Sequence, residues 1–181
     1  MTAQADFAQF NIQIDVTIRQ LREDDLPNLE WYGQFKHYRN LFRRSYDGQV
    51  NGYRFMLVAI VNNFPIGRLF IQYAHSRSRL SDGRTRGYLY SFQVMEVFRG
   101  QGVGTALINH AESILYEKDF SWVTISVTKD NDGALRLYQR LGYQIFAEDE
   151  GKWHYHDHYG RLKNVHEPCW LLKKRLSFSA K

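Results

Sequence analysis

The chain has 181 residues, of which 44% are hydrophobic and 15% aromatic, which is enough for one domain with its own core and excludes a disordered protein. A net charge of +5 suits an anionic ligand, and the scattered basic residues argue against a nucleic-acid-binding protein. The single cysteine, Cys169, excludes an internal disulfide, and the lack of a signal-peptide pattern or an apolar run of ~20 residues predicts a cytoplasmic protein without a membrane segment.

The first half of the chain alternates between strand and helix patterns. Residues 1–14 are polar and are expected to be flexible, and residues 15–181 are expected to form one domain. The pattern then predicts, in order, a strand over 16–21, a helix capped by 23–25 that contains Leu26, Leu29 and Trp31, a helix over 35–46, a strand over 53–61, a turn at 62–65, a strand over 66–73 and an exposed loop over 75–86.

The second half continues with the same mixture. It predicts a long apolar strand over 87–97, a helix with an apolar stripe over 103–115, a strand over 122–127, a helix over 131–141, and strands over 143–147 and 169–176. Asn131 is the predicted N-cap of the 131–141 helix, and Gly142 the residue that ends it. Helices mixed with antiparallel hairpins predict a single-domain α/β sandwich.

A glycine-rich turn joins the strand over 87–97 to the helix that follows. Gly100, Gly102 and Gly104 leave little side-chain bulk, so backbone N–H groups can point at one anion beside the positive end of the helix dipole. Arg99 adds a fixed positive charge. The turn matches neither G-x-G-x-x-G nor the P-loop, and a tight strand-to-helix connection is the alternative interpretation.

The turn does match R-x-x-G-x-G, which resembles the acetyl-CoA pyrophosphate loop of the GNAT superfamily of N-acetyltransferases. Residues 126–143 are similar to that family's N-x-x-A-x-x-x-Y helix followed by L-G-Y, with Asn131, Ala134 and Tyr138 at the matching positions. Both segments occur in the family's order, so the resemblance extends over about residues 16–176.

This resemblance implies a GNAT-type sandwich, in which helices flank a central mixed, mostly antiparallel sheet and a splayed strand pair binds acyl-CoA. It implies direct transfer of an acetyl group from acetyl-CoA to a primary amine through a ternary complex. Self-association is common in the family, so a homodimer is compatible with the sequence. The residues that the resemblance assigns to acetyl-CoA are Phe92, Gln93, Val94, Arg99, Gly100, Gln101, Gly102, Val103, Gly104, Thr105, Asn131, Ala134 and Tyr138.

The resemblance also implies catalytic roles. Tyr138 is implied as the general acid for the leaving thiolate, and an ordinary phenol, with a pKa of ~10, is roughly matched to a thiol. It lies one helical turn beyond Ala134, where ordinary packing is the alternative. The backbone N–H near Val94 is implied as the oxyanion donor. Asn131 is expected to orient the cofactor arm, to cap its helix, or both.

The general base is not evident. Many family members carry a carboxylate on the strand before the loop, but residues 87–94 include no Asp or Glu, and Glu96 lies beyond the splayed section. Tyr90 and Ser91 are candidates for a water relay, and His75 has a suitable pKa in an exposed loop. We expect a water-mediated base or an amine that arrives partly deprotonated.

A segment rich in histidine and aromatic residues lies between the last two predicted strands. His154, His156 and His158 alternate as metal ligands on a strand would, but no resemblance supports a metal there, and none is expected. Trp153 and Tyr155, with Tyr159, are expected to form walls of the acceptor site.

Two alternatives and one further basic surface remain. The missing carboxylate leaves a non-catalytic acyl-CoA-binding or sensing module as the main alternative, and a nucleic-acid-binding protein as a weaker one. The basic face of the predicted 35–46 helix is expected to be solvated, or to line the acceptor entrance. Its residues are Lys36, Arg39, Arg43 and Arg44. The acceptor itself is not encoded in any recognisable motif.

Overall fold

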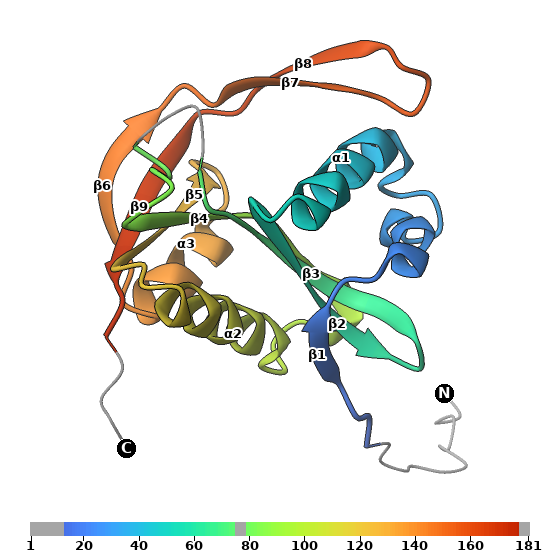
Figure 1. The fold of residues 1–181 in the computed structure, drawn as a ribbon, viewed down its shortest axis with the longest axis horizontal. Helices are drawn as coiled ribbons and strands as arrows, with labels where there is room; N and C mark the ends of the chain where they lie inside the picture. Colours follow the sequence, from blue (N-terminus) through green and yellow to red (C-terminus); the bar gives the residue numbers. More distant parts are fainter. Residues whose placement is uncertain (1–12, 75–78, 178–181) are drawn as a thin grey trace, which may run out of the picture.

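The computed structural model describes residues 13–74 and 79–177, and in this part of the chain seven strands form the main sheet (Figure 1). Its order is β1-β2-β3-β4-β5-β9-β6, and every neighbouring pair is antiparallel except β4 and β5, which run parallel. The predicted α/β sandwich with a mixed, mostly antiparallel sheet is therefore confirmed. The strands are β1 (Thr17–Gln20), β2 (Arg54–Val61), β3 (Phe64–Gln72), β4 (Arg86–Val94), β5 (Trp122–Thr128), β9 (Cys169–Arg175) and β6 (Gln144–Asp149). His75 and most of the 1–14 segment lie outside the described residues.

Helices cover both faces of this sheet. Helix α1 (Arg39–Val50) and the 3-10 helix η1 (Glu23–Glu30) cover one face, called here the α1 face, whereas α2 (Val103–Glu117) and α3 (Asp132–Arg140) cover the other, the α2 face (Figure 1). Successive side chains of a strand point to opposite faces, so β2 directs Met56 and Val58 into the α1 core and Leu57 and Ala59 into the α2 core. Both faces of β2 are buried, which explains its continuous apolar sequence.

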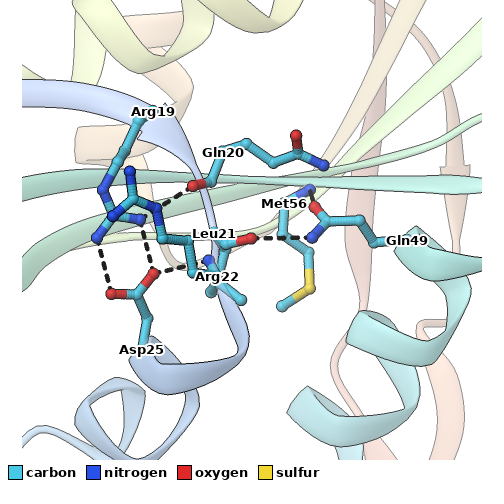
Figure 2. Close-up of polar contacts among 7 residues, drawn as sticks. All are labelled: Arg19, Gln20, Leu21, Arg22, Asp25, Gln49 and Met56. Atoms are coloured by element: carbon cyan, nitrogen blue, oxygen red, sulfur yellow. Dashed lines mark hydrogen bonds and ion pairs between the residues drawn. The ribbon is translucent and has the colours of Figure 1, made fainter.

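The end of α1 is joined to the sheet by the side chain of Gln49 (Figure 2). Its Nε2 donates to the Leu21 carbonyl at 3.0 Å, and its Oε1 accepts from the Met56 backbone N–H at 2.8 Å. The Leu21 N–H in turn donates to the Met56 carbonyl at 2.7 Å. One amide thus satisfies backbone groups on two segments at the point where the chain leaves β1.

The segment predicted as the first helix forms η1 and is held at its start by Asp25. The Asp25 carboxylate accepts from both terminal nitrogens of Arg19, at 2.7 and 2.8 Å, and from the Arg22 N–H at 2.7 Å (Figure 2). Pro27 lies inside this helix and has no N–H to donate, which disfavours a regular α-helix. Residues 31–33 all have positive φ, between 44° and 95°, and end it.

Other boundaries also differ from the sequence prediction. The strand predicted to reach Val97 ends at Val94, and a 3-10 turn, η3 (Glu96–Phe98), leads into the glycine-rich turn. The second helix begins as a 3-10 turn, η2 (Lys36–Tyr38), before α1. The β2–β3 turn is only Asn62–Asn63, both with positive φ, as in a two-residue hairpin.

A separate two-stranded hairpin, which the sequence did not indicate, crosses the top of α1 in Figure 1. It consists of β7 (Lys152–His156) and β8 (Leu162–His166). The Asn40 side chain of α1 donates to the Asp157 carbonyl at 2.5 Å and fixes the hairpin tip against that helix. Among the described helices, none combines the length and apolar character that crossing a membrane requires.

Candidate active site

The centre of the site is the point where β4 and β5 separate. Their pairing stops at Leu89 and Ile125. From there β4 stays with β3 as far as Val94, while β5 stays with β9 as far as Thr128. Residues 90–94, all within the described chain, therefore have no strand partner on the β5 side. Their backbone polar groups on that side can bind an extended ligand, as predicted for the splayed pair.

The backbone of Val94 faces this opening. The next residue, Met95, donates its N–H to the Ile66 carbonyl of β3 at 2.8 Å. Backbone groups alternate along a strand, so the N–H and carbonyl of Val94 point away from β3. The Val94 carbonyl accepts from Arg99 Nε at 3.0 Å. The remaining N–H has the direction that the predicted oxyanion donor requires.

A β-bulge at Ser91 sets the side-chain pattern of this section. Ser91 has a φ of 53°, and the register changes from Phe70 opposite Tyr90 to Arg68 opposite Gln93. Two residues of β4 thus lie opposite one of β3, which shifts the alternation of side chains by one position. The bulge was not predicted, because a register shift is visible only when the partner strand is known.

The bulge places the ring of Phe92 on the α2 face. Phe92 packs against the α2 core, and a Cβ added to Gly104 would lie 3.0 Å from its Cζ. The Phe92 and Tyr138 ring centroids are 6.2 Å apart. The first motif, at the start of α2, and the second, on α3, therefore meet across β4.

The glycine-rich turn presents the N-terminus of α2 without a side-chain cap. Gly100 and Gly102 have φ values of 73° and 87°, a region that side chains rarely adopt. Gly102 is the N-cap, and the Ala106 N–H donates to its carbonyl at 2.9 Å. The N–H groups of residues 103–105 precede that first intrahelical bond, so they are free to bind an anion at the positive end of the dipole.

Two polar side chains of the predicted cofactor set bind the turn itself. Arg99 holds the Val94 carbonyl, and Gln101 Nε2 donates to the Val97 carbonyl at 3.0 Å. Both residues are exposed, so their charge and dipole remain at the mouth of the turn. These two hydrogen bonds hold the glycine-rich turn in its conformation.

Tyr138 lies in the wall of the α2 core, with a side chain only 4% exposed. Burial raises the pKa of its phenol well above the usual 10, and the nearby Tyr88 adds to this effect. The pKa of Tyr138 therefore lies further from that of a thiol than the pKa of an ordinary phenol, and the phenol keeps its proton at neutral pH. The role of Tyr138 as general acid stays a prediction. Tyr88 itself bridges the fork, because its hydroxyl lies 2.8 Å from Ser126 Oγ on β5.

Asn131 caps α3, as predicted. Its Oδ1 accepts the Ala134 N–H at 3.1 Å, and Gly142 follows the helix with a φ of 91°. These two residues define the length of the helix and so the position of Tyr138. The cap occupies the amide oxygen, which leaves the Nδ2 of Asn131 for a ligand.

Two comparisons of sequence identify the family. The model of the acetyltransferase (GNAT) family matches residues 17–143. The chain belongs to the GNAT family. It is also similar to an uncharacterized N-acetyltransferase from Methanocaldococcus jannaschii, with 30% identity over an alignment of 154 positions that covers 75% of this chain and 63% of that protein.

Solved GNAT structures share the fold. Ard1 from Thermoplasma volcanium and Arabidopsis thaliana NAA60 in complex with acetyl-CoA each align with a TM-score of 0.68 and 20% identity, covering 90% of this chain and 99% of theirs. The ribosomal-protein-S18-alanine N-acetyltransferase of Escherichia coli aligns with a TM-score of 0.67 and 18% identity, covering 92% and 97%. At such identities the likeness concerns the fold.

The base candidates of this GNAT chain differ in their surroundings. The Tyr90 hydroxyl donates to Ser45 Oγ on α1 at 3.2 Å, and burial raises its pKa above 10, so the phenol does not act as a base at neutral pH. Ser91 Oγ accepts from Arg68 Nε at 3.4 Å. Both residues therefore suit a relay that passes a proton through hydroxyls or water better than direct proton removal.

The predicted acceptor walls lie together on the α1 face. Tyr155 is 9% exposed, and its ring centroid is 4.9 Å from that of Tyr38 and 5.4 Å from that of Trp153. His37 of η2 borders the same rings at 6.1 Å from Tyr155. Tyr159 lies in the hairpin turn, 69% exposed, and does not join this aromatic cluster.

Arg68 is the functional candidate that sequence reasoning missed. It lies in the middle of β3, 2% exposed, with its guanidinium carbon 4.3–5.0 Å from the ring centroids of Trp31, Phe35 and Phe42. Burial lowers its pKa from 12.5 to about 9. The signal in the sequence was a single arginine inside an otherwise apolar strand.

The sequence also singled out possible metal ligands, the basic residues of α1 and the cysteine. Among the described residues, no three His, Cys, Asp or Glu side chains come close enough to hold a metal ion. The basic residues of α1 are exposed, and Arg39 and Arg43 pair with Glu30 and Glu23 of η1. Cys169 is buried on β9 beside Leu80 and Leu171, opposite Thr128 of β5.

Proposed function

We propose that the protein is an N-acetyltransferase that transfers the acetyl group of acetyl-CoA directly to a primary amine within a ternary complex. The observation that carries the proposal is the fork between β4 and β5, which opens beside the uncapped N-terminus of α2. The fork offers strand-like backbone groups to the pantetheine arm, and the turn offers N–H groups to the pyrophosphate.

The same geometry supports a reaction between two faces of the sheet. The α2 face holds the turn and Tyr138, and the α1 face holds the aromatic cluster of Tyr38, Trp153 and Tyr155. Acetyl-CoA therefore enters along the α2 side of β4 and the amine from the α1 side. Cys169 is buried on β9 opposite Thr128, and direct attack by the amine requires no acyl-enzyme on it.

In the proposed step, the amine nitrogen attacks the thioester carbonyl carbon, and the C–S bond breaks as the tetrahedral intermediate collapses. The Val94 N–H stabilises the oxyanion. Tyr138, held protonated by burial, gives its proton to the thiolate sulfur, and the amine loses one proton to water near Tyr90 and Ser91. The phenolate then recovers that proton, so the products are the amide and the free thiol.

The test is a thiol-release assay with acetyl-CoA and a panel of amines, followed by product mass measurement. The panel contains peptide N-termini, lysine side chains, polyamines, aminoglycosides and small amino acids. We expect thiol release above background with at least one class of amine. Tyr138→Phe should lower kcat roughly 100-fold, the usual contribution of a general acid, while acetyl-CoA binding persists.

The absence of a carboxylate on residues 87–94 favours one alternative, a non-catalytic acyl-CoA-binding module. It predicts that acetyl-CoA binds without thiol release across the whole panel. A Tyr138→Phe protein with unchanged turnover would instead keep the enzyme but remove Tyr138 from its mechanism.

A further inference from the structure

Arg68 is buried without the partner that a buried charge normally has. Within the described residues its guanidinium forms no ion pair, and its Nη1 has no hydrogen-bond partner. Its Nε reaches only Ser91 Oγ, at 3.4 Å. Buried cations are usually paired, because removing a charge from water costs several kcal/mol.

The aromatic rings around Arg68 offset part of that cost but do not explain the residue. Three rings surround the guanidinium carbon within 5.0 Å. A leucine or methionine would fill the same space between Phe35 and Phe42 without any desolvated charge. A cation retained there, with its Nη1 unpaired, points to an anionic ligand.

The position of Arg68 indicates which ligand. It lies opposite Gln93 on the β3 side of the bulge, on the α1 face of the sheet. The turn that suits a pyrophosphate belongs to α2, on the other face. An anion at Arg68 is therefore part of the acceptor rather than of the coenzyme.

The charged and titratable groups around it agree with this assignment. His37 and Tyr38 of η2 lie between Arg68 and the hairpin. Burial lowers the pKa of His37 most, and the positive charges of His158 and then Arg68 lower it further. Lys36 and Arg39 are exposed at the same entrance. Glu30, the carboxylate beside them, is paired with Arg39 at 2.5 Å, so it does not neutralise Arg68.

We propose that Arg68 binds a carboxylate of the acceptor and thereby places the acceptor amine beside the Ser91 bulge. This inference rests on the proposed transferase function and names its substrate class: amines with a carboxylate a few bonds away. Free amino acids and peptides with an acidic first residue share this chemistry. Because Arg68 is 2% exposed and its guanidinium lies closest to the Phe35 ring, that ring must move when such an acceptor binds.

The kinetic test compares acceptors in pairs that differ only in one carboxylate. Alanine against alaninamide tests the free amino acid, and a peptide that begins with aspartate against the same peptide with asparagine tests the acidic N-terminus. The amines of a pair differ in basicity, so the quantity measured is the carboxylate preference in kcat/KM of the wild type relative to that of each variant.

Arg68→Met should reduce the carboxylate preference at least tenfold in at least one of the two acceptor pairs. Arg68→Lys should retain only part of the preference, because the charge stays but the planar fork is lost. The control is Arg136→Gln, which removes an exposed positive charge from α3 on the opposite face of the sheet and should leave the preference within about twofold. A wild type without preference in either arm, or an Arg68→Met protein that keeps it, overturns the proposal.

A binding measurement separates this proposal from the transferase function. Calorimetry with CoA present measures the affinity of N-acetylalanine and N-acetylalaninamide, which are products and need no turnover. Tighter binding of N-acetylalanine to the wild type, lost in Arg68→Met, supports the carboxylate site even if no amine is acetylated and the transferase proposal fails. Equal affinities for the two products, together with acetyl transfer that shows no carboxylate preference, overturn the carboxylate site at Arg68. The transferase proposal then still stands.

Discussion

Replacing Arg68 by methionine should make the unliganded protein more stable, although Arg68 is among its most buried side chains. The fall of the Arg68 pKa from 12.5 to about 9 corresponds to about 5 kcal/mol against the charged form in the folded state. Three ring contacts, each worth about 0.5–1 kcal/mol, offset roughly half of that. Methionine keeps much of the packing, so we expect a gain of about 1–3 kcal/mol.

The sign of the pH dependence follows from the same shift. The folded protein binds the Arg68 proton less tightly than the unfolded chain, so the charge destabilises the fold fully below about pH 9. The destabilisation diminishes only as the pH rises above that value. The gain on substitution should therefore be constant from about pH 6 to about pH 8.

Urea unfolding at neutral pH measures the effect directly, with the slope m expected to stay unchanged. The matched control is Arg54→Met on the neighbouring strand. Arg54 is half-buried, donates to Ser45 Oγ at 3.1 Å and lies over the rings of Tyr53 and Tyr90, so its loss should destabilise the protein. If Arg68→Met also loses more than about 1 kcal/mol, Arg68 is a structural residue and the reasoning about its charge is refuted.

Three further predictions concern the supports of the site. Burial raises the pKa of Asp25, but hydrogen bonds from Arg19 and a backbone N–H outweigh it and hold the pKa below 3.8. The carboxylate therefore stabilises the fold above that value, and this contribution should be lost in acid unfolding as the pH falls below 3.8. Asn131→Ala removes the α3 cap and should cost about 1 kcal/mol in thermal unfolding. Gly104→Ala crowds the Phe92 ring and should raise the Kd of acetyl-CoA about tenfold by calorimetry, or about 1.4 kcal/mol.

Further variants and contrary outcomes test these three predictions. Asp25→Asn should make the stability of the protein depend less on pH in the acid range, and an unchanged pH dependence contradicts the role of Asp25. Gly133→Ala, in the first turn of α3 with only an ordinary contact at 3.8 Å, should leave the affinity for acetyl-CoA unchanged. An Asn131→Ala protein as stable as the wild type would show that the cap hydrogen bond is replaced by water.

The local structure of the proposed coenzyme side was largely predictable because its signals are local. Glycine conformation, the N-cap of Asn131 and the end of its helix at Gly142 each depend on residues within a few positions. The boundary errors also have local causes, such as Pro27 inside η1. Acceptor identity has no such local pattern, since the walls come from η2 and from β7, more than a hundred residues apart.

By itself, then, the sequence determined the family, the order of the main-sheet strands and their helices, and the glycine-rich turn and capped helix that we propose face the coenzyme. The tertiary structure alone decided the bulge at Ser91, the meeting of Phe92 with Tyr138, and the burial of Arg68. The rings that cover Arg68 are those of Trp31, Phe35 and Phe42. The physical reason is that strand register and burial depend on which distant segments pack together. An arginine in an apolar strand points to an anionic ligand only when the folded structure shows that no counter-charge lies beside it.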